Sequence, residues 1–341
     1  MTDELAVPRR PPLVAVARLA RVAPSTASRA LKESPRISEA TRLRVHAAAL
    51  GLGYQPNRVA QSLRARSAPF VGIVVPDIAI TFYSRFVKGA QEVLEAAGYQ
   101  ALVLNTEREA RHEEVALRTL EGHRVSGILL ATSRPSAPEP QIPTVYFDSL
   151  APDRGVARVA LSNEQGMELL VGHLAAHGHE RIGYIGGPPT FTSGAERLAG
   201  FRAAAERRGL DRRAAYVEIG DSAWSPESAA AAISRLFALA EPPTAVVAAG
   251  DTLALGAIGA CRAEGRRVPD DLALVAFDDP LFGALFDPPL TALRRSDDEL
   301  GRRAARLLLE SLGGGGGPEP RDLRLPVELV VRRSCGCPAA G

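Results

Sequence analysis

The chain has 341 residues, of which 46% are hydrophobic, so it is long enough and apolar enough for two or three domains with buried cores. No apolar run approaches the roughly 18 to 20 residues that a membrane span needs. The first twelve residues are charged and proline-rich, without the apolar segment of a secretory signal. We therefore expect a cytoplasmic protein that does not act at a membrane.

The chain contains three cysteines. Cys261 stands alone, whereas Cys335 and Cys337 are separated by one glycine. A Cys-x-Cys pair with no second pair and no histidine near it in sequence is a poor metal site. We therefore expect free, reduced thiols and no bound metal, and a redox or metal role of the end region is the alternative.

The net charge of +2 is unevenly distributed along the chain. Residues 1–68 hold 12 Lys and Arg against 4 Asp and Glu, a balance of +8, and the remaining 273 residues hold 29 against 35, a balance of −6. A basic segment is often only a solvated surface. Because this one coincides with a pattern of short helices, it indicates a surface that faces nucleic-acid phosphates.

Three short helices are predicted in the basic segment, after a disordered arm over 1–12. The first covers 13–20, the second begins at Pro24, and the third runs from about 38 to 50 with Ser38 as its N-cap. The second helix has polar side chains and one arginine on one face and small apolar side chains on the other. This pattern is typical of the DNA-reading helix of a helix-turn-helix unit. A further helical pattern over 57–64 is too short to be stable alone.

From residue 70 onward, apolar β-rich runs alternate with helical patterns. Strands are predicted near 70–75, 101–105, 127–131, 144–147, 158–161, 181–187, 216–219, 245–248, 272–277 and 324–331. Helices are predicted near 82–97, 110–121, 163–177, 195–208, 226–240, 252–264 and 297–311. Alternation of this kind gives doubly wound parallel sheets, and its restart near residue 181 indicates two lobes. Ligands of such folds bind at the carboxyl ends of the strands.

Several motifs follow one another at regular positions in the basic segment. They are Val16-Ala17-Arg18-Leu19-Ala20, Ser25-Thr26-Ala27-Ser28-Arg29-Ala30-Leu31, Ser38-Glu39-Ala40-Thr41-Arg42, Leu52-Gly53-Tyr54-Gln55-Pro56-Asn57 and Ala60-Gln61-Ser62-Leu63-Arg64. In order and spacing they resemble the DNA-binding head of the lactose and galactose repressor (LacI/GalR) family. The resemblance extends to about Cys335 and therefore covers nearly the whole chain.

This resemblance implies the fold class and the domain organisation. The expected fold is an all-α helix-turn-helix head followed by a two-lobed α/β core of doubly wound parallel sheets, like the type I periplasmic binding proteins. The expected domains are the disordered arm (1–12), the DNA-binding head (13–56), a hinge helix with linker (57–68) and the effector-binding and dimerisation core (69–334). The two lobes are expected at about 69–161 and 162–334, with the chain crossing between them near the C-terminal end.

A helix that reads DNA needs side chains that match base edges in the major groove. Arg29 can place two donors on guanine O6 and N7, and a contact with phosphate alone is the alternative. By the resemblance, Leu63 is the hinge leucine that wedges into the minor groove, and an ordinary linker residue is the alternative. The resemblance implies that operator DNA is contacted by Pro24, Ser25, Thr26, Ser28, Arg29, Asn57, Ala60 and Leu63.

Two residues beside this helix depart from the family pattern. Ala23 stands where the family commonly has a capping serine, a change that costs about 1 kcal/mol of helix stability. Arg21 stands where the family commonly has glycine, so the turn is either strained or gains a phosphate contact.

The two lobes are expected to hold a small ligand between them. Trp224, the only tryptophan, follows a predicted strand in a loop, where an exposed indole suits the C–H face of a sugar ring; burial in the core is the alternative. By the resemblance, Arg197 and Asp251 bind effector hydroxyls or a carboxylate, and a structural salt bridge is the alternative. Asp278 and Asp279 are interpreted as structural residues of the lobe. The resemblance implies an effector site made of Phe82, Tyr83, Asp148, Phe191, Ser193, Arg197, Trp224 and Asp251.

Together these features predict a homodimeric, sequence-specific transcriptional regulator. We expect a repressor that binds palindromic operator DNA under the control of a small effector, expected to be a sugar. The alternatives are a sugar-binding protein of the periplasmic type without a DNA role, and a regulator with a purine-like or other non-sugar effector. We recognise no nucleophile with a base, metal cluster or phosphate loop, and interpret His173, His177 and His179 as residues of a helix end. No catalytic residue, enzymatic activity or cofactor is therefore expected.

Overall fold

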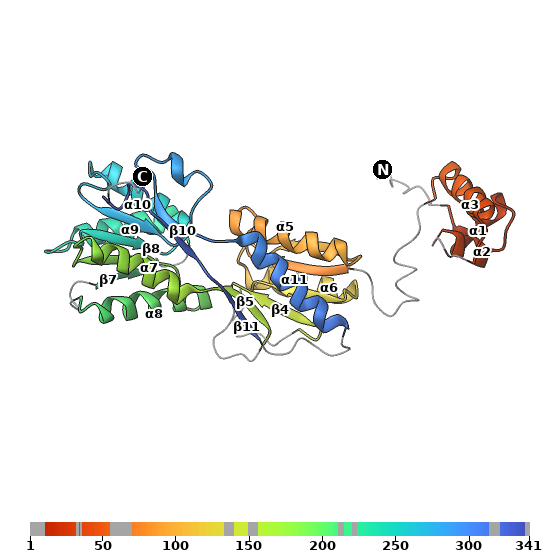
Figure 1. Cartoon of the computed structure of the whole chain (residues 1–341), viewed down its shortest axis with the longest axis horizontal. Coiled ribbons are helices and arrows are strands. Elements are labelled where there is room, and N and C mark those ends of the chain that lie inside the picture. The colour runs from red at the N-terminus through yellow and green to blue at the C-terminus, as the bar shows by residue number, and fades with distance from the viewer. Residues whose placement is uncertain are drawn as a thin grey trace, which may run out of the picture. The chain divides into compact units, whose positions relative to one another are not determined.

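The computed structural model describes residues 11–31, 34, 36–54, 70–132, 140–148, 156–210, 215–219, 224–313 and 321–337. The chain forms two units that divide after Ala68, a small helical head and a larger α/β core (Figure 1). The expected hinge at 57–68 lies outside the described residues, as do residues 1–10 of the expected arm.

The head consists of three helices, α1 (Leu13–Leu19), α2 (Pro24–Ala30) and α3 (Glu39–Gly51). Small apolar side chains from all three close its core: Val16, Ala17, Ala20, Ala27, Ala30, Val45, Ala48 and Ala49. Pro24 occupies the first position of α2, where its missing N–H would have no helical partner anyway. Ser38 precedes α3, but its hydroxyl bonds Thr41 Oγ1 at 3.0 Å instead of accepting from a backbone N–H, so the predicted cap does not form.

The first lobe of the core is a six-stranded parallel sheet flanked by helices. Its strand order is β11-β5-β4-β3-β1-β2, with every described pair parallel. Its elements are β1 (Phe70–Val75), α5 (Thr81–Ala96), β2 (Gln100–Asn105), α6 (Ala110–Gly122), β3 (Gly127–Leu130), β4 (Thr144–Phe147), β5 (Arg158–Leu161), α11 (Asp297–Gly313) and β11 (Asp322–Leu325). Strands β1, β3, β4 and β5 are almost wholly buried and apolar, as expected for strands covered on both faces.

The second lobe repeats this architecture. Its strand order is β12-β10-β9-β8-β6-β7, and only the edge strand β12 is antiparallel to its neighbour among the described strands. Its elements are α7 (Asn163–Ala176), β6 (Ile182–Gly186), α8 (Thr192–Arg207), β7 (Ala215–Ile219), α9 (Pro226–Phe237), β8 (Ala245–Ala248), α10 (Asp251–Ala263), β9 (Ala273–Ala276), the 3-10 helix η1 (Gly283–Leu285), β10 (Thr291–Arg294) and β12 (Glu328–Val330). The predicted fold class is thus confirmed.

The chain crosses between the lobes three times within its described part, at Ser162, at 295–296 and at 326–327. Helix α11 and strand β11 therefore belong to the first lobe, although the sequence placed them in the range of the second. The predicted single strand at 324–331 is wrong, because Pro326 separates two short strands that join different sheets. Strand β10 was not predicted at all.

Helices α5 and α11 lie side by side on the first lobe (Figure 1). They meet at two glycines that leave no room for a side chain: a Cβ atom at Gly89 would lie 1.9 Å from the Asp298 carbonyl oxygen, and one at Gly301 would lie 2.0 Å from that of Phe86. This close packing attaches the returning segment to the first lobe. None of the described helices combines the length and hydropathy needed to cross a membrane.

Candidate functional site

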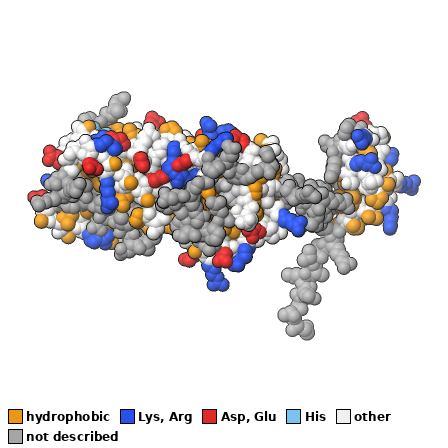
Figure 2. Space-filling view, turned by 90° about the horizontal axis from the view of Figure 1, so that it is seen from below, with side chains coloured by type: hydrophobic (Ala, Val, Ile, Leu, Met, Phe, Trp, Pro, Cys, Tyr) orange, Lys and Arg blue, Asp and Glu red, His pale blue; other side chains and the backbone are white. Residues whose placement is uncertain are grey.

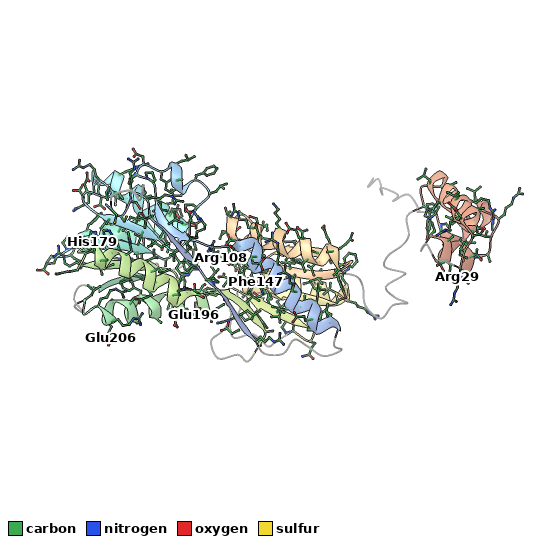
Figure 3. All side chains as sticks on the ribbon, viewed as in Figure 1. Arg29, Arg108, Phe147, His179, Glu196 and Glu206 are labelled. Atoms are coloured by element: carbon green, nitrogen blue, oxygen red, sulfur yellow. The ribbon has the colours of Figure 1, made fainter. Side chains whose placement is uncertain are left out.

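The exposed face of α2 is polar, and its opposite face is buried. Pro24, Ser25 and Arg29 are exposed, Thr26 and Ser28 are half-buried, and Ala27 and Ala30 lie in the core. The Arg29 side chain runs back along the helix, so that its Nε donates to the Ser25 carbonyl oxygen at 3.2 Å. Its terminal nitrogens remain at the surface, where they can reach another molecule (Figure 3). Asn57, Ala60 and Leu63 lie outside the described residues.

The surface of the head is basic. Its described residues contain six arginines and one glutamate, and Figure 2 shows arginine side chains beside apolar ones on its visible surface. Helix α2 starts without a side-chain cap, as expected from Ala23. Arg21 in the preceding turn has a φ of 51°, a left-handed conformation that glycine adopts more easily. Of the two alternatives stated for Arg21, backbone strain is therefore present.

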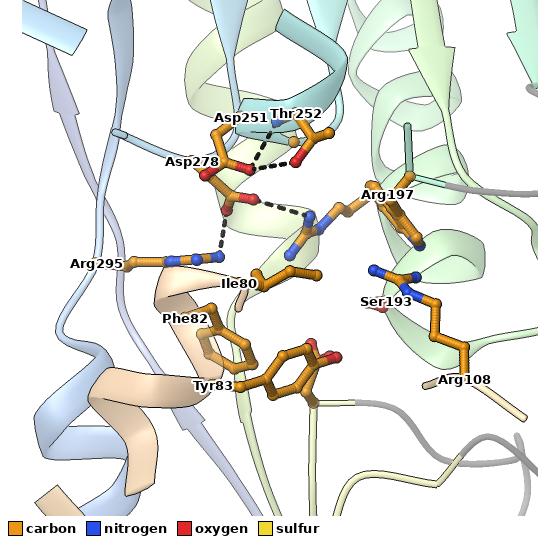
Figure 4. A pocket seen from close by; sticks show the side chains of 13 residues that line it. Ile80, Phe82, Tyr83, Arg108, Ser193, Arg197, Asp251, Thr252, Asp278 and Arg295 are labelled. Carbon is orange, nitrogen blue, oxygen red and sulfur yellow. Dashed lines mark hydrogen bonds and ion pairs between the residues drawn. The ribbon is translucent and has the colours of Figure 1, made fainter. Parts of the chain in front are cut away.

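A cleft of about 490 Å³, open to solvent, lies between the two lobes of the core (Figure 4). Thirteen residues line it, and each follows the carboxyl end of a strand or lies in the first turns of the next helix. The first lobe contributes Ile80, Phe82, Tyr83, Arg108 and Asp148. The second lobe and its crossing segment contribute Ser193, Arg197, Trp224, Gly250, Asp251, Thr252, Asp278 and Arg295. This is where the doubly wound topology places a ligand site.

Seven of the eight residues expected at the effector site line this cleft. The exception is Phe191, which directly precedes α8 and is not among the residues that line the cleft. The expected site did not include Ile80, Arg108, Gly250, Thr252 and Arg295, and Asp278 was interpreted as a structural residue of the lobe. Arg295 could not be predicted because its strand, β10, was not predicted. Thr252 could have been predicted, because it directly follows the expected Asp251.

On the wall of the first lobe, aromatic side chains are fixed by packing and by one hydrogen bond. The rings of Phe82 and Tyr83 meet edge to face with centroids 4.9 Å apart. Tyr83 Oη donates to Asp148 Oδ2 at 3.0 Å, and Asp148 itself has a φ of 58°. Burial and the adjacent Asp148 carboxylate raise the pKa of Tyr83 well above its ordinary value, so the phenol remains a hydrogen-bond donor.

On the wall of the second lobe, Arg197 is almost completely buried and held from several sides. Its Nε donates to Asn163 Oδ1 at 2.9 Å, and its Nη1 donates to the Ala249 carbonyl oxygen at 2.6 Å. Its guanidinium lies 3.8 Å from the ring centroid of Phe277 and 5.4 Å from that of Trp224. These contacts fix the plane of the guanidinium before any ligand binds.

Trp224 packs its indole close to the backbone of the second lobe. A Cβ atom at Gly187 would lie 2.4 Å from the indole, so this glycine makes room for the ring. Asp251 lies nearby and accepts hydrogen bonds from the Thr252 backbone nitrogen at 2.7 Å and from its hydroxyl at 3.1 Å. Burial and the carboxylate of Asp278 raise the pKa of Asp251.

Arg295 joins the two lobes at the base of the cleft. Its guanidinium forms an ion pair with Asp278 of the second lobe and lies 4.6 Å from the ring centroid of Phe82 in the first (Figure 4). Its Nε also lies 2.8 Å from Asp297 Oδ1, at the start of α11. Despite the cost of burial, these surrounding aspartates raise the pKa of Arg295, which remains a cation. Burial in turn raises the pKa of Asp297 to about 6.

A second network connects the cleft to the crossing strands. Glu196 of α8 accepts hydrogen bonds from Arg158 of β5 at 3.0 Å and from Arg324 of β11 at 2.6 and 2.7 Å. It also accepts one from Asn163 at 2.7 Å, and Asn163 is the residue that holds Arg197 in the cleft. The two arginines belong to the first lobe and Glu196 to the second. A ligand that moves Arg197 therefore acts on groups that bridge the lobes.

Comparisons with known proteins agree with this architecture. Residues 13–57 match the bacterial regulatory proteins of the lacI family, and residues 171–335 match a periplasmic binding protein-like domain. The chain is 36% identical to the HTH-type transcriptional regulator CelR of Thermobifida fusca, over 96% of this chain and 98% of that protein. It is 32% identical to the HTH-type transcriptional repressor CytR of Escherichia coli K12, over 94% of each chain.

Solved structures show the same likeness over nearly the whole chain. A lac repressor dimer bound to operator and the anti-inducer ONPF superposes with a TM-score of 0.85 at 28% identity, over 96% of this chain and 99% of that one. A complex of the regulator CelR with cellobiose gives a TM-score of 0.72 at 34% identity, over 95% of this chain and 100% of that one. The chain belongs to the LacI family and is a DNA-binding transcriptional regulator with a helix-turn-helix head.

Proposed function

We propose that this regulator is a homodimeric repressor whose affinity for a palindromic operator is set by a neutral sugar bound in the cleft, and that it works in the cytoplasm, where operator DNA lies. The observation that carries the proposal is the cleft itself, in which fixed aromatic, Arg and Asp side chains from both lobes converge. A ligand that touches both walls favours one arrangement of the lobes over another. Such differential binding is all that allosteric control requires.

The charge of the cleft favours a neutral, hydroxyl-rich ligand. Three arginines and three aspartates line it, namely Arg108, Arg197, Arg295, Asp148, Asp251 and Asp278. Because the cationic donors and the anionic acceptors are equal in number, a ligand that both donates and accepts hydrogen bonds fits better than an anion. The negative charge of an anion would be repelled by the three aspartate carboxylates. Aromatic faces beside charged hydrogen-bonding groups suit the C–H faces and hydroxyls of a sugar ring. The CelR–cellobiose complex makes cellobiose the first ligand to test.

In the operator complex, α2 lies in the major groove with Arg29 on a guanine edge. Pro24 and Ser25 face neighbouring bases, whereas Thr26 and Ser28, half-buried beside the exposed face of the helix, hold phosphates. Asn57, Ala60 and Leu63 of the hinge segment complete the contact, with Leu63 wedged into the minor groove. One such head contacts few base pairs, so a dimer on two half-sites provides the specificity.

Control runs from the cleft to the hinge segments through the movement of the lobes. Effector binding changes lobe closure, closure changes the spacing of the two hinge segments in the dimer, and operator affinity follows. The bridging groups, Arg295 and the network around Glu196, make closure a change between two arrangements of ion pairs. Coupling of this kind is typically worth about 1 to 3 kcal/mol.

The effector is tested by thermal melting of the full chain with cellobiose, a hexose, a pentose and a purine base. We expect cellobiose or another sugar to raise the melting temperature, and Trp224→Ala and Asp251→Asn to remove that rise. The matched controls are Phe282→Ala, a residue that is 61% exposed and lies outside the cleft, and Asp270→Asn on the surface; both should keep the ligand response. A response to the purine base alone would replace the sugar by a purine-like effector. An unchanged sugar response in both cleft variants would refute the site.

A further inference from the structure

The structure brings His173 and His177, at the end of α7, together with Cys337 of the C-terminal segment, which follows Cys335 by two residues. We propose that His173, His177, Cys335 and Cys337 bind one Zn²⁺ ion, which attaches the C-terminal segment to helix α7 of the second lobe. Neither the effector cleft nor the head includes any of these residues. The proposal is thus independent of the proposed function.

The spacing of the ligand atoms fits a tetrahedral metal. His173 and His177 are four residues apart at the end of α7, so both rings project from one face, with centroids 4.5 Å apart. Cys337 Sγ lies 3.3 Å from His173 Nε2, and one ligand atom from each of these three residues lies within 4.8 Å of the others. Zinc bonds of the usual length to nitrogen and sulfur separate neighbouring ligand atoms by about 3.3 to 3.8 Å. One pair is already at this separation, and the remaining pairs, all within 4.8 Å, need only small side-chain movements to reach it.

The imidazole of His177 is already in the tautomer that a metal needs. Its Nδ1 lies 2.7 Å from the His173 carbonyl oxygen, which can only accept, so the proton is on Nδ1. The lone pair is therefore on Nε2. Metal-binding histidines commonly use the second ring nitrogen in this way to fix their orientation.

Cys335 supplies the fourth ligand. It is 2% exposed and lies two residues before Cys337; its thiol donates to the Arg332 carbonyl oxygen at 3.5 Å, and the Thr291 hydroxyl donates to its sulfur at 3.2 Å. Two thiolates and two neutral imidazoles balance the charge of Zn²⁺, so the occupied site carries no net charge in its largely buried position. Tetrahedral sites with two sulfur and two nitrogen ligands are typical of structural zinc.

The backbone that carries the cysteines is held in place by other contacts. Ser334 accepts from the Thr291 backbone nitrogen at 2.8 Å and donates to the Leu274 carbonyl oxygen at 2.6 Å. Gly336 has a φ of 77°, a left-handed conformation that turns the chain between the two cysteines. The segment that carries both thiols is therefore held in place before the metal binds.

The position of the site points to a structural role. His177 lies in the connection from α7 to the start of β6, and Ser334 bonds beside the start of β9, so the cluster lies at the amino ends of the strands, opposite the cleft. The ion would join α7, which begins at one lobe crossing, to the segment that follows β12. Because binding stabilises the folded state by mass action, the second lobe should unfold at a higher temperature with zinc than without it.

The test uses the full chain, kept reduced with a phosphine, stripped with EDTA and titrated with Zn²⁺ or with Co²⁺ as a spectroscopic probe. We expect one equivalent of zinc per chain by elemental analysis, a thiolate-to-cobalt absorption band, and a higher melting temperature with zinc. Cys337→Ser and His177→Ala should each reduce zinc affinity at least about 10-fold. His177 is exposed, so its variant tests binding in a folded protein even if the cysteine variant is destabilised.

Two matched controls complete the experiment. Cys261→Ser removes the thiol outside the cluster, and His179→Ala removes a neighbouring histidine whose Nδ1 lies 3.0 Å from Thr244 Oγ1. Both should bind zinc like the unmodified chain. If the reduced protein bound less than about a tenth of an equivalent of zinc after the titration, the proposal would be overturned. Equal affinity in the His177→Ala variant and the controls would overturn it too.

Discussion

Replacing Arg295 by glutamine tests whether this buried cation holds the base of the cleft together. Its side chain is 11% exposed and lies between Asp278 (11%) and Asp297 (7%). Removing one partner of a buried ion pair typically costs about 3 to 5 kcal/mol, because the remaining charge stays buried. We expect the lower end, about 3 kcal/mol, since Arg197 stays 3.8 Å from Asp278 and compensates part of its charge.

The assay is thermal unfolding followed by the fluorescence of Trp224, the only tryptophan, which stands in the same cleft. A decrease of about 3 kcal/mol in the free energy of unfolding lowers the melting temperature of a domain of this size by about 6 to 12 °C. The matched control is Arg303→Gln on α11, a 57% exposed arginine paired with Glu299, which should cost less than about 1 kcal/mol. Equal melting temperatures for the two variants at pH 7 would refute this reasoning.

The pH dependence gives an independent check with a definite sign. The pKa of Asp297 is raised to about 6 in the folded chain, above its ordinary value of 3.8, so the folded state binds more protons between these values. Acidification through this range stabilises the fold through this group. Without the Arg295 cation, which lowers this pKa, protonation comes at still higher pH. The difference in free energy of unfolding between the unmodified chain and Arg295→Gln should therefore become smaller from pH 7 to pH 5. A difference that grows over this range would contradict the account.

Three further changes test the packing and the head. Gly89→Ala should lower the free energy of unfolding by about 1 to 3 kcal/mol, because its Cβ has no room against α11, whereas Gly122→Ala meets nothing within 4 Å and should be nearly neutral in the same melt. Arg21→Gly should relieve the strained turn and change head stability by less than about 1 kcal/mol, while reducing the salt dependence of DNA binding if Arg21 contacts a phosphate. Arg29→Ala should cost about 1 to 3 kcal/mol of binding free energy on a selected operator and relax the preference at one base pair. Thr26→Ala, at a proposed phosphate contact, should instead weaken binding to all sequences alike in titrations at fixed salt.

The sequence could predict the parts of this molecule that depend on local signals. The three helices of the head follow from apolar spacing and from Pro24 at the first position of α2, whereas the predicted Ser38 cap does not form. The cleft residues follow from the rule that strand ends gather at one edge. Trp224, Arg197 and Asp251 lie where that rule and the resemblance put them, although their contact with an effector stays a prediction.

What the sequence could not predict depends on contacts between distant segments. Arg295 follows a four-residue strand that pairs with the edge strand β12, and nothing local marks so short a strand. The return of α11 to the first lobe is fixed by its packing against α5, not by its own periodicity. The cluster around Cys337 joins residues 164 positions apart, which is why the Cys-x-Cys pair had no visible histidine partner.

The central claim is that a ligand in the cleft controls the affinity of the head for DNA. It is tested most directly by measuring the operator dissociation constant of the full chain at fixed salt, with and without a saturating amount of the ligand that most stabilises the core. The operator is first selected from a randomised DNA library. We predict that the ligand changes operator affinity by about 5- to 150-fold, and that Asp270→Asn keeps this change whereas Trp224→Ala loses it. A ligand that saturates the cleft yet leaves operator affinity within about twofold would contradict the claim.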